Sequence, residues 1–412
     1  MISSPQFGVF LRRNQAFIGL GGITPAWTNP SSGYHVPEST LPNLPYKPSS
    51  FNWTTTKATG VNLGGWLVQE STIDSTFWNS HPPTASNEWT LCKTLGAHCG
   101  PVLEHRYRTF ITPADIDTLA SVGVSILRIP TTYAAWIDLP GSELYSGSQR
   151  TYLRRITEYE ISRYGMHVII DVHSLPGGLN GLTIGEATGH WGWFSMRRPG
   201  GHSMEVVDEV LEFIRGSSSP ASFTLEPMNE PADRNGDDDL GMAVFGTPEA
   251  LSDDAASYIP SFWQAVLARV RRSGLDVPVM FQSFKLPDYW TGDFSRGDNV
   301  VFDMHNYYFE GRETSSENLP EFIRSDAQNK SGDGTFPVFV GEWSIQAAHN
   351  NSFALRERNL KVGLEAWEEY TQGSCYWTAK LEGNGTIDGE GSQRDYWSFE
   401  RFIEEGFFSE VD

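Results

Sequence analysis

The sequence of 412 residues predicts an α/β fold, a closed (β/α)8 barrel (TIM barrel) that forms a single domain. Two observations favour this fold class. Eight short β-prone runs follow one another along the chain, and most are continuously apolar, as strands buried on both faces are. Helical patterns lie between many of the runs, and repeated right-handed β-α-β units can close a parallel sheet on itself. A doubly wound open sheet is the alternative.

The expected strands all lie beyond the first 57 residues of the chain. They cover 58–64, 124–130, 167–173, 222–230, 277–284, 299–308, 338–343 and 374–380. No internal repeat and no break in composition divides the chain after residue 50, which favours one domain over 51–412. Residues 1–50 are rich in Pro, Ser, Gly and Asn and show little periodicity, so we expect a loosely packed leader there.

The expected helices carry recognisable start and stop signals. Thr112 can cap a helix that has Pro113 at its first position and an acidic first turn. In a later helix, Phe262, Val266 and Val270 share one face, and Gly274 marks the end. The helix after the first strand is poorly marked. The helical patterns cover 112–122, 149–164, 204–215, 260–272, 318–329 and 353–370.

Charge and hydropathy exclude several classes of partner. The net charge of −21 argues against nucleic acid and against an anionic membrane surface, because like charges repel. A neutral substrate suits this charge, although solubility alone also explains it. No apolar run approaches the length that spans a bilayer.

The signals for secretion are mixed. Segment 16–27 is a weak apolar stretch interrupted by glycines and a proline, and it makes a poor secretory signal. The short spacing of Cys92 and Cys99 allows a small disulfide loop, with Cys375 as a buried thiol; three free thiols are the alternative. We expect a secreted glycoprotein, because Asn-x-Ser/Thr sequons occur at Asn52, Asn329, Asn350 and Asn384.

Two glutamates are candidates for catalysis because each lies at the end of a β-prone run. Glu230 lies in the sequence MNEP after the fourth run, and Glu342 lies in VGEW at the seventh. The carboxyl ends of barrel strands meet at one face, so both carboxylates are expected in one cleft. Two carboxylates in one cleft are the groups that cleave a glycosidic bond, one as acid/base and the other as nucleophile.

Polar or aromatic residues also end most of the other strands. An arginine inside an apolar strand is costly unless it is paired, so Arg128 is expected to pair with Glu342 and keep it ionised; an ion pair with Asp171 or another acid is the alternative. Trp377 can stack on a sugar ring or belong to the core. The remaining candidates at strand ends are Trp66, Glu70, His173, Asn229, His305 and Tyr307.

An ordered set of motifs resembles glycoside hydrolase family 5. The motifs are GVNLGGW from Gly60, LRIP from Leu127, DVH from Asp171, NEP from Asn229, HNY from His305 and GEW from Gly341. The resemblance implies Glu230 as acid/base and Glu342 as nucleophile. It also implies a sugar subsite lined by Arg128, His173, Asn229, His305, Tyr307 and Trp377, to which the strand-end pattern adds Glu70.

Within that family, the NLGGW opening looks most like fungal exo-β-1,3-glucanases and the related rutinosidases. The sequence departs from the usual exo-glucanase pattern after His173, before His305 and after Trp377. These positions belong to subsite walls, so β-1,3-glucan and flavonoid disaccharide glycosides both stay open as substrates.

The expected activity is that of a retaining β-glucosidase acting on chain ends or small glycosides through a covalent glycosyl-enzyme. The long segments 174–203, 232–248 and 381–395 should wall the cleft into a pocket. We expect a monomer with no metal and no cofactor. The alternatives are a metal hydrolase using Asp171, His173 and His305, for which no metal-ligand motif is present, and a non-catalytic sugar-binding barrel.

Overall fold

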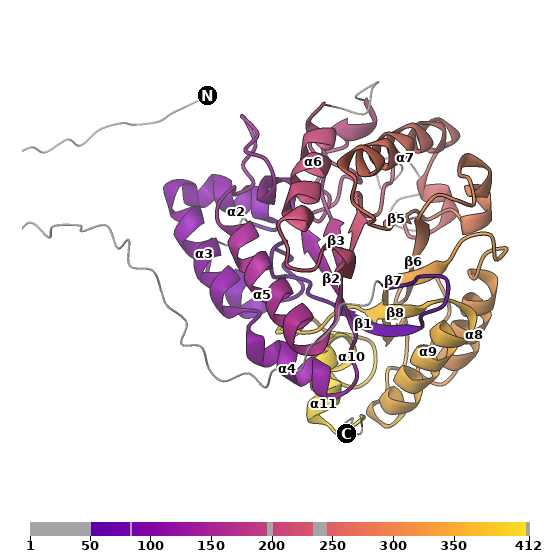
Figure 1. The fold of residues 1–412 in the computed structure, drawn as a ribbon. Coiled ribbons are helices and arrows are strands. Elements are labelled where there is room, and N and C mark those ends of the chain that lie inside the picture. Colours follow the sequence, from indigo (N-terminus) through magenta and orange to yellow (C-terminus); the bar gives the residue numbers. More distant parts are fainter. Residues whose placement is uncertain (1–50, 83–84, 196–200, 234–244, 409–412) are drawn as a thin grey trace, which may run out of the picture. The chain divides into compact units, whose positions relative to one another are not determined.

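The computed structural model describes residues 51–82, 85–195, 201–233 and 245–408. The leader expected over 1–50 lies outside the described residues. The described part forms a cylinder of parallel strands surrounded by helices (Figure 1). The strands follow sequence order around the cylinder, and the last pairs with the first: Ala58 lies opposite Gly373, and Val61 opposite Tyr376.

All eight expected strands are present, and the closed barrel is confirmed, so the open-sheet alternative is wrong. Most strands are shorter than the apolar runs that predicted them, because the chain leaves the hydrogen-bonded ladder of the sheet where it reaches the cavity. The strands are β1 (Ala58–Asn62), β2 (Ile126–Thr131), β3 (His167–Val172), β4 (Phe223–Glu226), β5 (Val279–Gln282), β6 (Val300–Tyr308), β7 (Val338–Ala347) and β8 (Gly373–Tyr376).

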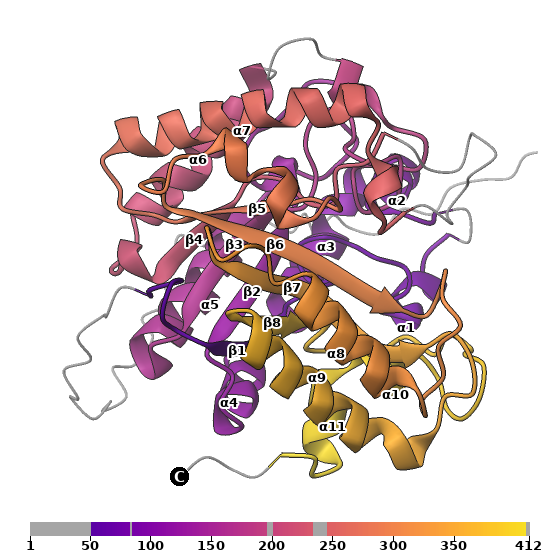
Figure 2. The ribbon, with the colours of Figure 1, turned by 90° about the vertical axis from the view of Figure 1, so that its right-hand side faces the viewer.

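The helices cover the outside of the cylinder (Figure 2). They are α1 (Ser75–Asn79), α2 (Glu88–Leu95), α3 (Cys99–Thr109), α4 (Pro113–Ser121), α5 (Gln149–Tyr164), α6 (Gly201–Arg215), α7 (Asp253–Ser273), α8 (Leu319–Asn329), α9 (Arg356–Tyr370), α10 (Arg394–Trp397) and α11 (Phe399–Glu404). Residues 283–299, all of which the structure describes, connect β5 to β6 through two short 3-10 turns and no α-helix.

Two helix starts show what the sequence signals mean. Thr112 caps α4 as expected, in a capping box in which the Asp115 carboxylate accepts from the Thr112 backbone N–H at 2.6 Å. The expected start of α7 at Pro260 is wrong. The helix begins at Asp253, where the Ser252 hydroxyl accepts from the third backbone N–H of the helix, and Pro260 lies inside it.

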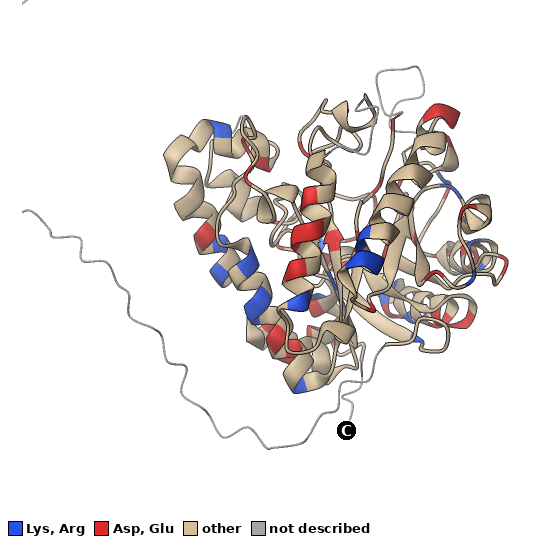
Figure 3. Cartoon of the chain, turned by 45° about the horizontal axis from the view of Figure 1, so that its top comes forward, with Lys and Arg blue, Asp and Glu red and all other residues tan. Residues whose placement is uncertain are grey.

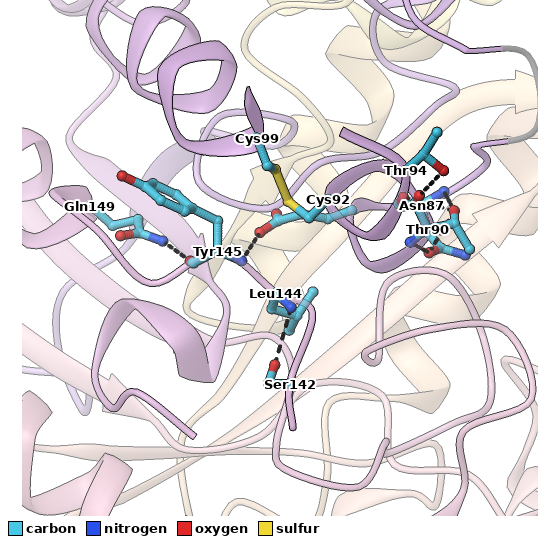
Figure 4. Close-up of a disulfide and its surroundings, with 10 residues drawn as sticks. Asn87, Thr90, Cys92, Thr94, Cys99, Ser142, Leu144, Tyr145 and Gln149 are labelled. Atoms are coloured by element: carbon cyan, nitrogen blue, oxygen red, sulfur yellow. Dashed lines mark hydrogen bonds between the residues drawn. A yellow bond between two sulfur atoms is a disulfide. The ribbon is translucent and has the colours of Figure 1, made fainter. Parts of the chain in front are cut away.

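The connection from β1 to β2 contains α1, α2 and α3, which the sequence did not mark clearly. A disulfide joins Cys92 at the end of α2 to Cys99 at the start of α3, as expected, and Cys375 is a buried free thiol (Figure 4). The helix α2 starts with a capping box between Asn87 and Thr90. The bridge thus fixes a short turn between two helices of modest length.

Acidic and basic residues are interspersed on the helices that face the viewer in Figure 3. This view shows no face of a single charge. None of the helices that the structure describes is long and apolar enough to cross a membrane.

The buried carboxyl of Glu88 makes the stability of this region depend on pH. Burial raises the pKa of Glu88 to about 8, against hydrogen bonds from the backbone of Tyr145 and Gln69 that lower it. A carboxyl whose pKa is raised by folding favours the native state at low pH, and this contribution is lost as the pH rises from about 4.5 through about 8.

We therefore expect Glu88→Gln to reduce the loss of unfolding free energy between pH 5 and pH 9 by roughly 2–4 kcal/mol relative to the parent protein. Urea unfolding followed by tryptophan fluorescence at several pH values measures this difference. The exposed Glu365→Gln on α9 is the matched control and should follow the parent curve. Parallel curves for Glu88→Gln and the parent would contradict the prediction.

Candidate active site

A cavity of about 510 Å³ opens at the carboxyl ends of the strands. Side chains that follow different strands reach into it: Glu70 after β1, His173 after β3, Glu230 after β4, Glu342 from β7 and Trp377 after β8. Each of the three long loops expected to wall the cleft also supplies lining residues, namely Ile184, Thr247, Pro248, Leu381 and Gln393. The cavity is therefore a pocket walled by loops on a barrel face.

The two candidate glutamates meet in this cavity, 112 positions apart in sequence (342 minus 230). A carboxylate oxygen of Glu230, one of Glu342 and a ring nitrogen of His305 all lie within 4.8 Å of one another. His305 Nδ1 lies 2.8 Å from Glu230 Oε1 and 3.5 Å from Glu342 Oε2. The barrel thus brings both carboxylates to a spacing that a single sugar ring can bridge.

A β-bulge aims Glu342 into the barrel. In the pairing of β6 with β7, Asp303 lies opposite Phe339 while His305 lies opposite Glu342, so β7 has one residue more than β6 in this stretch. Gly341 lies within the bulge, and its backbone N–H donates to Asp303 Oδ1 at 2.5 Å. A Cβ on Gly341 would lie 2.0 Å from Asp303 Oδ2, so the carboxylate requires a glycine there.

The backbone of Glu230 is held in an unusual conformation. Its φ of 48° lies in the left-handed region, which costs an ordinary residue about 1 kcal/mol. Two side chains hold this turn: the Glu230 N–H donates to Gln282 Oε1 at 2.7 Å, and Asn180 Nδ2 donates to the Glu230 carbonyl at 3.1 Å. Strain at a residue clamped from both sides is typical of a functional position.

The buried guanidinium of Arg128 orders the floor of the site. Its Nη1 donates to Glu342 Oε1 at 2.7 Å, as expected, and its Nη2 lies 3.2 Å from Asp171 Oδ2, so the alternative pair is also present. Glu226 receives two bonds from Arg128, at 2.7 and 3.0 Å. Arg128 Nη2 also donates to Asn229 Oδ1 at 2.8 Å, so the guanidinium links Glu342 to the residue that precedes Glu230.

The surroundings of Glu342 keep it ionised. Burial alone would raise its pKa, but the positive charges of His305 and Arg128 outweigh burial and hold the pKa of Glu342 below its ordinary value. Tyr307 adds to this effect, since its hydroxyl donates to Glu342 Oε2 at 2.7 Å.

His305 is the charged partner between the two glutamates. Burial would lower its pKa, but Glu342 and Asp303 raise the pKa of His305 well above the ordinary value. Both ring nitrogens face carboxylates, since Nε2 lies 3.2 Å from Asp303 Oδ2. Only the doubly protonated ring can donate on both sides.

Glu70 differs from the other acids in the cavity. Burial, with a smaller contribution from Glu342 and Glu230 and against His173, raises its pKa to about 8. Its Oε1 is buried and has no hydrogen-bond partner among the described residues. Because Glu70 also lines the cavity, its neutral carboxyl is available there to a ligand hydroxyl group.

The structure places the other expected site residues at different depths. His173, Tyr307 and Trp377 line the cavity, and the rings of His173 and Trp377 stack with centroids 5.9 Å apart. Arg128 and Asn229 are wholly buried behind the lining residues. They contact the cavity wall by hydrogen bonds, Arg128 to Glu342 and Asn229 to His173. Trp66 belongs to the core instead.

Sequence reasoning missed four residues that position the site: Asn62, Glu226, Gln282 and Asp303. Strand periodicity was a usable signal for two of them. Asp303 lies two residues before His305, and Glu226 lies four before Glu230, so both alternate onto the inward face of the barrel. Asn62 Nδ2 donates to the Gly341 carbonyl at 2.7 Å, a pairing across β1 and β7 that local sequence does not indicate.

Two groups of three side chains have the spacing of metal ligands among the described residues. They share His305 and are Glu226–Asp303–His305 and Glu230–His305–Glu342. Arg128 Nε lies 2.7 Å from Glu226 Oε2 and 3.8 Å from Asp303 Oδ2, so a guanidinium already supplies positive charge to the first group. The absence of a metal from the reaction stays a prediction.

The chain is similar to known glycosidases. A family model described as Cellulase (glycosyl hydrolase family 5) matches residues 99–383. A probable glucan 1,3-beta-glucosidase A of Aspergillus niger is 29% identical over 303 residues, which cover 72% of this chain and 67% of that protein. Glucan 1,3-beta-glucosidase 1 of Schizosaccharomyces pombe is 27% identical over 304 residues, covering 71% of this chain and 70% of that protein.

Solved structures give a second comparison. The crystal structure of rutinosidase from Aspergillus niger is 58% identical, covers 88% of this chain and 100% of its own, and superimposes with a TM-score of 0.84. A second structure, of a protein named AoRut, is also 58% identical, covers 87% of this chain and 99% of its own, and has a TM-score of 0.83.

Replacing Arg128 tests the buried charge network. Removal of one partner from a buried ion cluster leaves the others unpaired, which typically costs about 3–5 kcal/mol. We expect Arg128→Met to lose at least that much unfolding free energy in urea, or to fail to accumulate as soluble protein. Arg150→Met is the control, because Arg150 pairs with Glu209 on the surface, with side chains 47% and 44% exposed. It should change stability by less than about 1 kcal/mol.

Proposed function

Because the chain belongs to glycoside hydrolase family 5, we propose that it hydrolyses terminal β-D-glucosidic bonds with retention of anomeric configuration. The spacing of the Glu230 and Glu342 oxygens, within 4.8 Å, carries this proposal. Retaining glycosidases place their carboxyl groups about 5–5.5 Å apart, whereas inverting enzymes leave a wider gap for a water molecule. The alternative of a non-catalytic sugar-binding barrel gives no reason for this pair.

In the proposed first step, a Glu342 oxygen attacks the anomeric carbon and the bond to the leaving oxygen breaks. Arg128 and Tyr307 hold Glu342 in place from two sides, each at 2.7 Å, so the attacking carboxylate is ionised and oriented. Glu230 in its protonated form gives its proton to the leaving oxygen, while His305 orients its carboxyl group.

In the second step, Glu230 accepts a proton from water, and the water oxygen attacks the anomeric carbon of the glycosyl-enzyme. Glu342 leaves as a carboxylate. Two inversions at the same carbon give net retention. The carboxyl of Glu70, the neighbouring His173 and the ring of Trp377 are the groups we assign to binding the glucose unit.

Substitution of the two glutamates tests these roles. We expect Glu230→Gln and Glu342→Gln each to lower kcat on an aryl β-glucoside by roughly 10²–10⁴-fold, with unchanged thermal unfolding. Glu365→Gln on the outside of α9 serves as control and should keep full activity.

The stereochemical course separates the two glutamates. With added azide, Glu230→Gly should form the β-glycosyl azide and Glu342→Gly the α-glycosyl azide, because each anion enters from the face that its cavity leaves open. Proton NMR of the parent reaction should show the β-anomer of the free sugar first. Initial release of the α-anomer would rule out retention.

Similarity over 88% of the chain favours a second candidate function, that of a diglycosidase. The Aspergillus niger rutinosidase is 58% identical and fully covered, while the glucan glucosidases named above are 27–29% identical. On this reading the enzyme removes 6-O-α-L-rhamnosyl-β-D-glucose intact from a flavonoid glycoside. Both candidates use the same two glutamates and differ in what lies beyond the glucose.

A substrate series distinguishes the two candidates. Laminarin oligosaccharides, rutin and an aryl β-glucoside are each incubated with the enzyme, and the products are separated by chromatography. Stepwise release of glucose from laminarin supports the exo-glucosidase, whereas release of the disaccharide from rutin supports the diglycosidase. A rapid fall in laminarin chain length would contradict action at chain ends.

We also propose a secreted, N-glycosylated monomer. The disulfide is typical of oxidising compartments, and the sequon asparagines are exposed at 52, 329, 350 and 384. A mass shift after N-glycosidase treatment of protein recovered from a fungal culture medium, and its elution volume in size exclusion, check both points.

A further inference from the structure

The two sides of the cavity have different chemistry. The proposed acid Glu230 must face the leaving oxygen, so the leaving group lies on the Glu230 side of the glucose. Around the barrel, β5 and β6 adjoin β4 on that side, whereas β8 and β1 carry Trp377 and Glu70 on the other. The leaving-group side is therefore bounded by residues that follow β4, β5 and β6.

Aromatic rings line this side. Phe284 follows β5, and Phe245 belongs to the connection after β4; their ring centroids lie 5.0 Å apart with an edge-to-face angle of 70°. Both pack with Ala232, two residues after Glu230. Phe309, after β6, lies edge-on to Tyr307 with centroids 5.6 Å apart. These surfaces suit a flat, apolar group better than a second hydrated sugar.

A lysine also lines the cavity and contacts β6. Lys330 lies directly after α8 and lines the cavity. Its Nζ donates to the His305 carbonyl at 3.4 Å and to Asn306 Oδ1, which are both uncharged acceptors. An ammonium group has three protons, so one remains available to a ligand.

The carboxylate of Asp326, which acts electrostatically on Lys330, already has other partners. Asp326 accepts from both guanidinium nitrogens of Arg312, one at 3.1 Å, and from Asn306 Nδ2 at 3.1 Å. Within the described part of the chain, Lys330 itself forms no ion pair. Burial lowers its pKa to about 8, against a smaller raising effect of Asp326, so the ammonium is still mainly charged at neutral and acidic pH.

This charge contrasts with the rest of the cavity. Four acids line it, Glu70, Glu230, Glu310 and Glu342, in a chain of net charge −21. An anionic substrate group placed near them would be repelled. Lys330, with Arg312 beside it, offers the opposite charge on the leaving-group side.

We propose that Lys330 binds an acidic substituent, a carboxylate or a phenolate, on an aromatic leaving group that packs against Phe284 and Phe245. This inference rests on the proposed function, because the role of Glu230 defines the leaving-group side. It makes Lys330 a specificity residue, which acts on substrate binding and has no part in the chemical steps.

The test compares matched aryl β-glucosides. One pair is the 4-carboxyphenyl glucoside and its methyl ester; the other is the 3,5-difluoro-4-hydroxyphenyl glucoside, whose free phenol ionises near neutral pH, and its methyl ether. We expect Lys330→Met to raise KM about ten-fold for an acidic member and by less than about two-fold for its neutral partner, with kcat unchanged. Lys330→Arg should restore the preference. The pair of glucosides whose KM values change shows whether the site binds a carboxylate or a phenolate.

Controls separate recognition from folding. Lys361→Met removes an exposed lysine of α9 that pairs with Glu357 at 2.6 Å, and it should leave every KM unchanged. Equal losses on acidic and neutral members for Lys330→Met would overturn the proposal, because the lysine would then only tie α8 to β6. Equal KM values of the parent enzyme for both members would overturn it as well.

A binding measurement keeps the inference separate from the proposed function. Calorimetric titration of the parent protein and Lys330→Met with 4-hydroxybenzoate requires no turnover. Lysine-dependent binding together with no hydrolysis of any glucoside would refute the proposed function and support the anion site. If the neutral glucosides are hydrolysed and Lys330→Met binds 4-hydroxybenzoate as well as the parent protein does, only the anion site is refuted.

Discussion

A single buried cation organises the interior of this barrel. The guanidinium of Arg128 is fully shielded from solvent, and its five N–H groups and its charge are met by six side chains from five strands or their ends: Asn62, Asp171, Glu226, Asn229, Asp303 and Glu342. A buried charge on this scale is tolerated only when it is fully paired. The contacts of this one guanidinium therefore join side chains from around the barrel and fix the position of the Glu342 carboxylate.

This network explains how neighbouring acids can differ in state. Glu342 contacts two cationic groups, Arg128 and His305, and its pKa falls, while Glu70 is buried with fewer opposing charges and its pKa rises to about 8. The difference comes from the placement of cations within one small volume. A glycosidase needs such a division, because one carboxylate attacks while other carboxyl groups donate hydrogen bonds or protons.

The sequence was sufficient for the strands and for the meeting of two glutamates in one cavity, but not for the contacts that position them. Continuous apolar runs identified all eight strands, and glutamates at two of their ends predicted the pair. The start of α7 was misplaced because Ser252 and Pro260 are both plausible helix starts, and only packing decides between them. Trp66 was expected at the cavity, yet it is buried and its Nε1 donates to the Tyr107 carbonyl at 2.8 Å. The contact from Asn62 to Gly341 joins residues far apart in the chain, which periodicity cannot reveal.

The extra residue in β7 limits how this enzyme can diverge. Side chains alternate between the two faces of a strand, so Phe339 and Glu342, which are three residues apart, would face opposite sides of a regular strand. If β7 kept all its residues but lost the bulge, Glu342 would turn toward the surrounding helices. A side chain at position 341 that displaced Asp303 and straightened the strand would therefore abolish the site even if the barrel still closed. Insertions in the loops that wall the pocket carry no such penalty. Substrate range is thus free to change through loop length, while the irregular backbone of this one strand must be kept.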